Sequence, residues 1–187
     1  MYLGLDLGTS SVKALIVDAS GTAVASQSVP LQVIRRKAGW SEQDPQSWWD
    51  ATNRAVRSLG AEYPEEMRKI TGIGLSGQMH GLTALDANDT VLRPAILWND
   101  TRSASQAMQL DTGHPAFRQL GGNAVMPGFT APKAVWIAEN EPELFQRLDT
   151  VLLPKDYLRL RMTGEKASEM SDAAGTLWLD VARRDWS

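Results

Sequence analysis

The sequence contains no cysteine, so it forms no disulfide bond and offers no thiolate to a metal ion. It has only two histidines, His80 and His114, and they lack the short spacing of a zinc-binding pair. No apolar run is long enough to span a bilayer. Strand-like sequence starts at Met1, which leaves no room for a signal peptide. Together these absences predict a cytoplasmic protein.

A large excess of charge of one sign is also missing. Lys and Arg number 19 and Asp and Glu number 22, which gives a net charge of -3. This balance favours neither nucleic acid nor an anionic membrane as a partner. Neither a Walker nor a Rossmann glycine motif occurs, so the N-terminal glycines do not form a nucleotide-binding loop of those types. The 187 residues, 43% of them hydrophobic, suffice for one sizeable core.

The first thirteen residues are the most informative segment. Alternation over residues 2–7 puts leucines on one face of a strand and Gly4 and Asp6 on the other. A carboxylate in an apolar strand must be paired, hydrogen-bonded or bound to a metal. Gly8, Thr9 and Ser10 then offer backbone amides and hydroxyls that can hold phosphate oxygens. We therefore predict a phosphate-and-metal site at the mouth of a β-hairpin.

The hydrophobic pattern predicts an α/β domain, because strands come first and helices are then interspersed among them. Asp18, Asp86 and Asp89 fit turns between strands, and Trp48 fits helix packing. The strands are expected at 2–7, 11–18, 22–30, 70–75, 82–85, 91–92, 95–98 and 150–153. A helix from Asp44 and Pro45 to Gly60 is expected, with others at 101–110, 131–139, 142–147 and 155–162 and a loop over 111–130.

A second polar motif follows the strand expected at 70–75. Gln78, Met79 and His80 are bracketed by Gly77 and Gly81, which let the backbone approach a ligand closely. An imidazole can bond a ligand hydroxyl, and a methionine gives adaptable apolar contact. The motif thus predicts a ligand-binding loop, against the alternative of a histidine that is satisfied within the protein.

Other candidate site residues lie further along. Trp98, Asn99 and Asp100 end a strand, where ligand sites of α/β proteins open. Trp98 is either a ligand contact or a core residue, and Asp100 is either a ligand contact or a helix cap. Phe129 and Lys133 are candidates to line the same ligand site. Lys133 also fits the alternative of a surface charge on the following helix.

Several segments resemble the FGGY family of carbohydrate kinases, and they follow in the order which that family uses. The resemblance covers the whole chain. Its Gln-Met-His combination is similar to that of the xylulokinases within the family. Besides the N-terminal segment, the matching stretches are residues 40–49, 76–81, 93–102, 127–133 and 171–176.

The resemblance implies a ribonuclease H-like α/β domain of the actin and hexokinase superfamily, with a mixed β-sheet, as the first lobe of a two-lobe kinase. It implies ATP-dependent phosphorylation of D-xylulose to D-xylulose 5-phosphate, with Asp6 as catalytic residue and ligand to Mg²⁺. A homodimer is what the family suggests. The implied ATP-phosphate contacts are Gly8, Thr9, Ser10 and Lys13, although Lys13 is equally a solvated strand residue. The implied sugar contacts are Gln78, Met79, His80, Trp98, Asn99, Asp100 and Phe129.

By the same resemblance, residues 1–187 form an incomplete N-terminal kinase domain. The ATP-binding lobe and the aspartate that accepts the hydroxyl proton are then expected beyond residue 187, and the chain alone is expected to be inactive. Two alternatives stay open. One is another FGGY kinase acting on a different ketose or polyol, and the other is a non-catalytic sugar-binding module.

Overall fold

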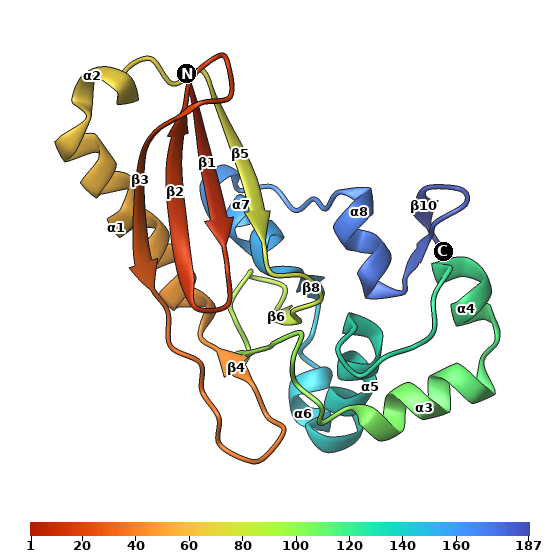
Figure 1. Ribbon diagram of the computed structural model, residues 1–187. Coiled ribbons are helices and arrows are strands. Elements are labelled where there is room, and N and C mark those ends of the chain that lie inside the picture. Colours follow the sequence, from red (N-terminus) through yellow and green to blue (C-terminus); the bar gives the residue numbers. More distant parts are fainter.

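A mixed sheet of four strands organises the chain, all of whose residues 1–187 are described by the computed structural model (Figure 1). The strands lie in the order β3-β2-β1-β5. Strand β5 runs parallel to β1, whereas the other neighbours are antiparallel. This confirms the predicted N-terminal meander and the mixed sheet. The bounds are β1 (Tyr2–Leu7), β2 (Ser11–Val17), β3 (Ala23–Pro30) and β5 (Gly72–Gly77).

Helix α1 (Pro45–Glu62) packs on one face of this sheet (Figure 1). Its start is as predicted, because the Asp44 carboxylate caps it and a proline occupies its first turn. Its predicted end at Gly60 is wrong, since the helix continues to Glu62. The chain leaves the helix only at Tyr63, which precedes Pro64 and is therefore disfavoured in a helical conformation.

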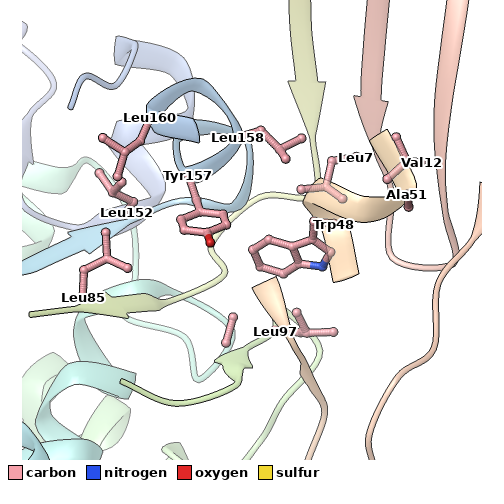
Figure 2. Packing of buried hydrophobic residues seen from close by; sticks show 11 residues of the cluster. Leu7, Val12, Trp48, Ala51, Leu85, Leu97, Leu152, Tyr157, Leu158 and Leu160 are labelled. Carbon is pink, nitrogen blue, oxygen red and sulfur yellow. The ribbon is translucent and has the colours of Figure 1, made fainter. Parts of the chain in front are cut away.

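Trp48 of α1 lies in the middle of the largest buried apolar cluster (Figure 2). Its indole is fully buried, and its ring centre lies 6.2 Å from that of Tyr157 in an edge-to-face arrangement. Leu7 and Val12 come from the sheet and Leu97 from a later segment. The core therefore joins the sheet to the rest of the chain, and the prediction that Trp48 is a packing residue is confirmed.

The remaining elements are short. Asp18 and Asp86 close turns as predicted, each accepting two backbone hydrogen bonds. No helix is both long enough and apolar enough to cross a membrane. The remaining strands are β4 (Glu42–Gln43), β6 (Thr83–Leu85), β7 (Ala95–Ile96), β8 (Thr150–Leu152), β9 (Leu179–Asp180) and β10 (Asp185–Trp186). The remaining helices are α2 (Pro64–Met67), α3 (Ala104–Gly113), α4 (Ala116–Gly121), α5 (Thr130–Asn140), α6 (Pro142–Phe145), α7 (Pro154–Thr163), α8 (Met170–Ala173) and the 3₁₀ helix η1 (Ala174–Thr176).

Residues 111–130 contain more helix than predicted. Helix α3 continues to Gly113, and α4 lies wholly inside the segment. Gly122 ends α4 with a φ of 64°. This glycine thus terminates a helix, so the segment is not a continuous loop.

Strand β5 also departs from the prediction of a buried strand at residues 70–75. It spans Gly72–Gly77 and forms an edge of the sheet. No strand pairs with the outer side of β5, and Ile73 on this strand is 52% exposed. A short apolar run does not reveal from sequence whether a strand lies inside a sheet or at its edge.

Candidate functional site

The turn between β1 and β2 leaves two backbone amides free. The Gly8 amide donates to the Ser11 carbonyl at 3.0 Å, and a Cβ at Gly8 would lie only 3.2 Å from that oxygen. The amides of Thr9 and Ser10 donate to no other group of the chain. Successive unpaired amides in a tight turn form a concavity that suits an anion. The geometry therefore fits the predicted role of this turn in holding phosphate oxygens.

Asp6 lies on the sheet face opposite α1, and its side chain is exposed. In the strand register Lys13 is its neighbour on β2 and Ser76 its neighbour on β5. No three carboxylate or imidazole groups gather into a metal-binding cluster. Mg²⁺ is commonly held by one or two carboxylates together with waters and substrate phosphates. A single exposed Asp6 beside free turn amides fits that mode of binding.

Gln78 joins the turn to the second polar motif. Its Oε1 accepts a hydrogen bond from the Thr9 hydroxyl at 3.0 Å, and its backbone amide donates to the Leu7 carbonyl at 2.7 Å. Its Nε2 donates to Gln43 Oε1 at 2.9 Å. The side chain is buried and both ends of its amide are used within the chain. Gln78 thus connects the two motifs, and its hydrogen bonds within the chain hold its side chain in place.

Thr9 and Gln43 extend this network. The Thr9 hydroxyl also accepts from the Trp98 indole at 3.0 Å, and its carbonyl accepts from Gln43 Nε2 at 2.7 Å. Gln43 Oε1 accepts from the Trp48 indole at 3.0 Å. Sequence reasoning missed Gln43, although it lies in the 40–49 match, because glutamine is usually exposed. The network ties the turn to the hydrophobic core.

The backbone of His80 is held in an unusual conformation. Its φ is 62°, a value that residues with a side chain rarely adopt. The His80 carbonyl accepts hydrogen bonds from Lys133 Nζ at 2.8 Å and from the Thr130 hydroxyl at 3.1 Å. Lys133 is fully buried and also donates to the Gly128 carbonyl. The surface-charge alternative for Lys133 is therefore wrong, because the ammonium anchors the His80 loop.

The imidazole of His80 is packed between two other segments. Its ring centre lies 4.6 Å from that of Phe129, and a Cβ added to Gly175 would lie 2.1 Å from its Nδ1. Burial, together with the charge of Lys133, lowers the pKa of His80 from 6.5 to about 4. The ring is therefore neutral near pH 7, and one nitrogen can donate while the other accepts.

Met79 and Trp98 expose large apolar surface near this loop. The two residues are 45% and 43% exposed. Met79 lines a cavity of about 370 Å³ that Ser76 also lines. The Trp98 indole donates a hydrogen bond to the Thr9 hydroxyl. Exposed methionine and tryptophan next to hydrogen-bonding groups suit the mixed surface of a sugar.

Asp100 lies in a different environment from the other predicted sugar contacts. It is 1% exposed, and its carboxylate accepts two hydrogen bonds from the Arg102 guanidinium and one from the Ser41 amide. No face of this carboxylate is open to a ligand, so we leave Asp100 out of the sugar contacts that we propose. Nor is Asp100 the N-cap of α3, since Ser103 occupies that position. Asn99, the preceding residue, has a buried Oδ1 with no hydrogen-bond partner.

The fold and the comparisons define the class of protein. The chain has the α/β fold shared by sugar kinases of the actin and hexokinase type. Over residues 1–187 the sequence matches the FGGY family of carbohydrate kinases, N-terminal domain. The chain belongs to this family.

Individual relatives are highly similar. The chain is 56% identical over 187 residues to a xylulose kinase of Escherichia coli (strain K12) and 57% identical to one of Klebsiella pneumoniae. A solved structure described as a xyloylose kinase from Brucella ovis superimposes with a TM-score of 0.97 at 60% identity. Each match covers 100% of this chain but only 38% of the relative. The chain thus spans well under half the length of these proteins.

Proposed function

We propose that the chain is the sugar-binding lobe of a xylulokinase, an enzyme that transfers the γ-phosphoryl group of ATP to D-xylulose and forms D-xylulose 5-phosphate. The observation that carries the proposal is the hydrogen bond between Thr9 and Gln78, which holds the turn between β1 and β2 beside the loop of residues 78–80. The high identity to proteins named xylulose kinases supports the choice of sugar.

In this proposal Met79 and His80 hold the sugar, with Trp98, Asn99 and Phe129 around them. The neutral imidazole bonds a hydroxyl, and Met79 contacts the carbon skeleton. The tight backbone contacts at His80 fix the orientation of the ring before the sugar arrives. Such pre-organisation places the primary hydroxyl for in-line transfer.

The turn and Asp6 serve the phosphate side. The free amides of Thr9 and Ser10 bind phosphate oxygens, and Asp6 orders the hydrated metal. A Mg²⁺ ion held by Asp6 would neutralise charge on the phosphoryl group that is transferred. Lys13 neighbours Asp6 in the register and has no salt bridge, so it is available to a phosphate.

The proton acceptor is proposed to lie in a part of the enzyme outside these residues. Two other carboxylates of the chain are already paired with cations, since Asp100 pairs with Arg102 and Asp172 pairs with Lys155. Asp6 serves the metal. The cytoplasmic location and the homodimer remain predictions.

The test is ATP consumption by the full-length protein that carries this chain, measured against a panel of ketoses and polyols. We expect D-xylulose to give the highest kcat/KM. Preference for another sugar would instead support the alternative FGGY kinase. No turnover with any sugar would support a non-catalytic sugar-binding module. Turnover by residues 1–187 alone would contradict the placement of the proton acceptor.

A further inference from the structure

A concave site that adjoins the proposed sugar site at Asn99 lies beside the segment of residues 35–41, which we call the basic loop. It is a cavity of about 460 Å³. We propose that this cavity binds a phosphorylated sugar, with the phosphate on the basic side chains and the hydroxyl groups on the cavity wall. The proposal does not rest on the proposed function. The lining residues are Arg35, Arg36, Lys37, Ala38, Gly39, Trp40, Ser41 and Asn99.

The basic loop is fixed at both its base and its tip. At the base Ile34 and Glu42 exchange two backbone hydrogen bonds of 2.8 and 3.0 Å. At the tip Gly39 has a φ of 75°, and its carbonyl accepts from the Thr101 amide at 2.8 Å. A Cβ at Gly39 would lie 2.4 Å from the Thr101 hydroxyl, so only glycine fits this contact. The cavity is thus preformed, which lowers the entropic cost of binding.

The charge of the basic loop is not neutralised. Arg35, Arg36 and Lys37 are exposed and form no salt bridge, and no carboxylate lines the cavity. Lys37 lies with its ammonium 4.7 Å from the centre of the Trp40 ring, which keeps it close to the wall. Three unpaired cations in one concave site, on a chain of net charge -3, favour an anionic ligand. Guanidinium groups bind phosphate through paired N–H donors, which makes a phosphate a suitable ligand.

The wall of the cavity offers groups for the rest of the ligand. The buried atoms Ser41 Oγ and Asn99 Oδ1 have no hydrogen-bond partner within the chain. Such orphaned groups are rare in folded proteins and are often satisfied by a ligand or water. Each can accept a hydrogen bond from a ligand hydroxyl once its side chain turns toward the cavity. Because these two groups can bond hydroxyls, we infer that the cavity fits a phosphate ester of a polyol better than inorganic phosphate alone.

The test is calorimetric titration of the 187-residue chain with D-xylulose 5-phosphate, inorganic phosphate and D-xylulose. The test variant is Arg35→Ala/Arg36→Ala/Lys37→Ala. The matched control is Arg54→Ala/Arg57→Ala/Lys69→Ala, which removes the same charge from exposed side chains elsewhere. We expect the sugar phosphate to bind the control like the wild type and to bind the test variant about tenfold more weakly or worse. Equal affinity for the two variants, or no binding by the wild type, would overturn the proposal.

Ser41→Ala separates a sugar phosphate from free phosphate. It removes only the unpartnered hydroxyl, because the backbone amide of Ser41 still bonds Asp100. We expect about a fivefold loss of affinity for the sugar phosphate, the worth of one hydrogen bond, and none for inorganic phosphate. Equal losses for both ligands, or no loss for either, would refute the hydroxyl contacts. The titration measures binding at the basic loop and involves no turnover. A negative result would therefore refute this site without bearing on the proposed kinase activity.

Discussion

The position of the His80 backbone and ring is set by contacts with residues that are distant in the sequence. Lys133 and Thr130 hold its carbonyl, and Gly175 and Phe129 pack on its ring. These partners come from α5 and η1 and the chain just before α5, far along the sequence. The orientation of the imidazole is therefore a property of the folded domain rather than of the loop.

Gly175→Ala tests this packing. The new methyl group would lie 2.1 Å from His80 Nδ1, so the ring or η1 must shift. We expect a destabilisation of about 1–3 kcal/mol and weaker sugar binding, measured by urea unfolding and D-xylulose titration. Gly60→Ala is the control, because nothing lies within 4 Å of its added Cβ. It should stabilise α1 by about 0.5–1 kcal/mol. Equal unfolding free energies and equal affinities for D-xylulose in the two variants would show that the close contact between Gly175 and His80 affects neither stability nor binding.

The buried imidazole also makes stability depend on pH. Burial lowers the pKa of His80 to about 4 in the folded protein, whereas the pKa of His80 in the unfolded chain is near 6.5. The unfolded state therefore binds more protons between these values, and stability must fall as pH drops from 6.5 toward 4. In urea unfolding at several pH values, His80→Gln should show a shallower decline over that window. An unchanged slope would contradict the lowered pKa.

The site could be predicted from sequence only in part. Glycines and a carboxylate in an alternating strand pointed to the turn and to Asp6. The glycine-bracketed motif pointed to Met79 and His80. Lys133 was not recognised as a buried anchor, because lysine is rarely fully buried and its partners are backbone carbonyls. The role of Asp100 depends on Arg102 and a backbone amide, which no spacing rule brings together.

At the scale of elements, a buried ionic cluster holds β4, β7 and the start of α3 together. The Arg102 guanidinium pairs with Asp100 and Glu42 and stacks 3.7 Å from the centre of the Trp40 ring. Arg93 also pairs with Glu42. The arginine side chains are 1% and 8% exposed, so each charge depends on its partners for stabilisation.

Arg102→Met should therefore be severely destabilising. It leaves the Asp100 carboxylate buried without its cation, which costs about 3–5 kcal/mol. The control is Arg118→Met, since the Arg118 side chain is 57% exposed in its pair with Asp111 and should contribute little to stability. Denaturant unfolding of both variants gives the comparison. Equal losses of unfolding free energy in the two variants would mean that the buried ion pair of Arg102 is no more important for stability than the exposed pair of Arg118.

Long periodic elements were predicted well and short ones less well. The three N-terminal strands and α1 have clear periods of two and 3.6 residues and recognisable caps. Helix α4 has only six residues and lies between glycines and prolines. Its existence depends on packing of Leu120 and Gly121 against β9 and Leu177, which local sequence does not reveal.

At the scale of the whole molecule, α1 links the sheet to the rest of the chain. One face of the helix packs on the strands, and Trp48 packs on Tyr157 of α7. The network from the Trp48 indole through Gln43 reaches Thr9 and Gln78. The turn between β1 and β2 and the loop of residues 78–80 are thus both connected to the core through Trp48.

The central claim is that sugar binds at the Met79 and His80 loop. The most direct measurement is titration of D-xylulose against the wild-type chain, His80→Ala and His114→Ala. His114 is the only other histidine and is exposed, so it is the matched control. We predict that His80→Ala weakens D-xylulose binding by about tenfold or more, as loss of a buried hydrogen bond and its ring contacts requires, while His114→Ala binds like the wild type. Equal affinity of all three proteins for D-xylulose would contradict the claim.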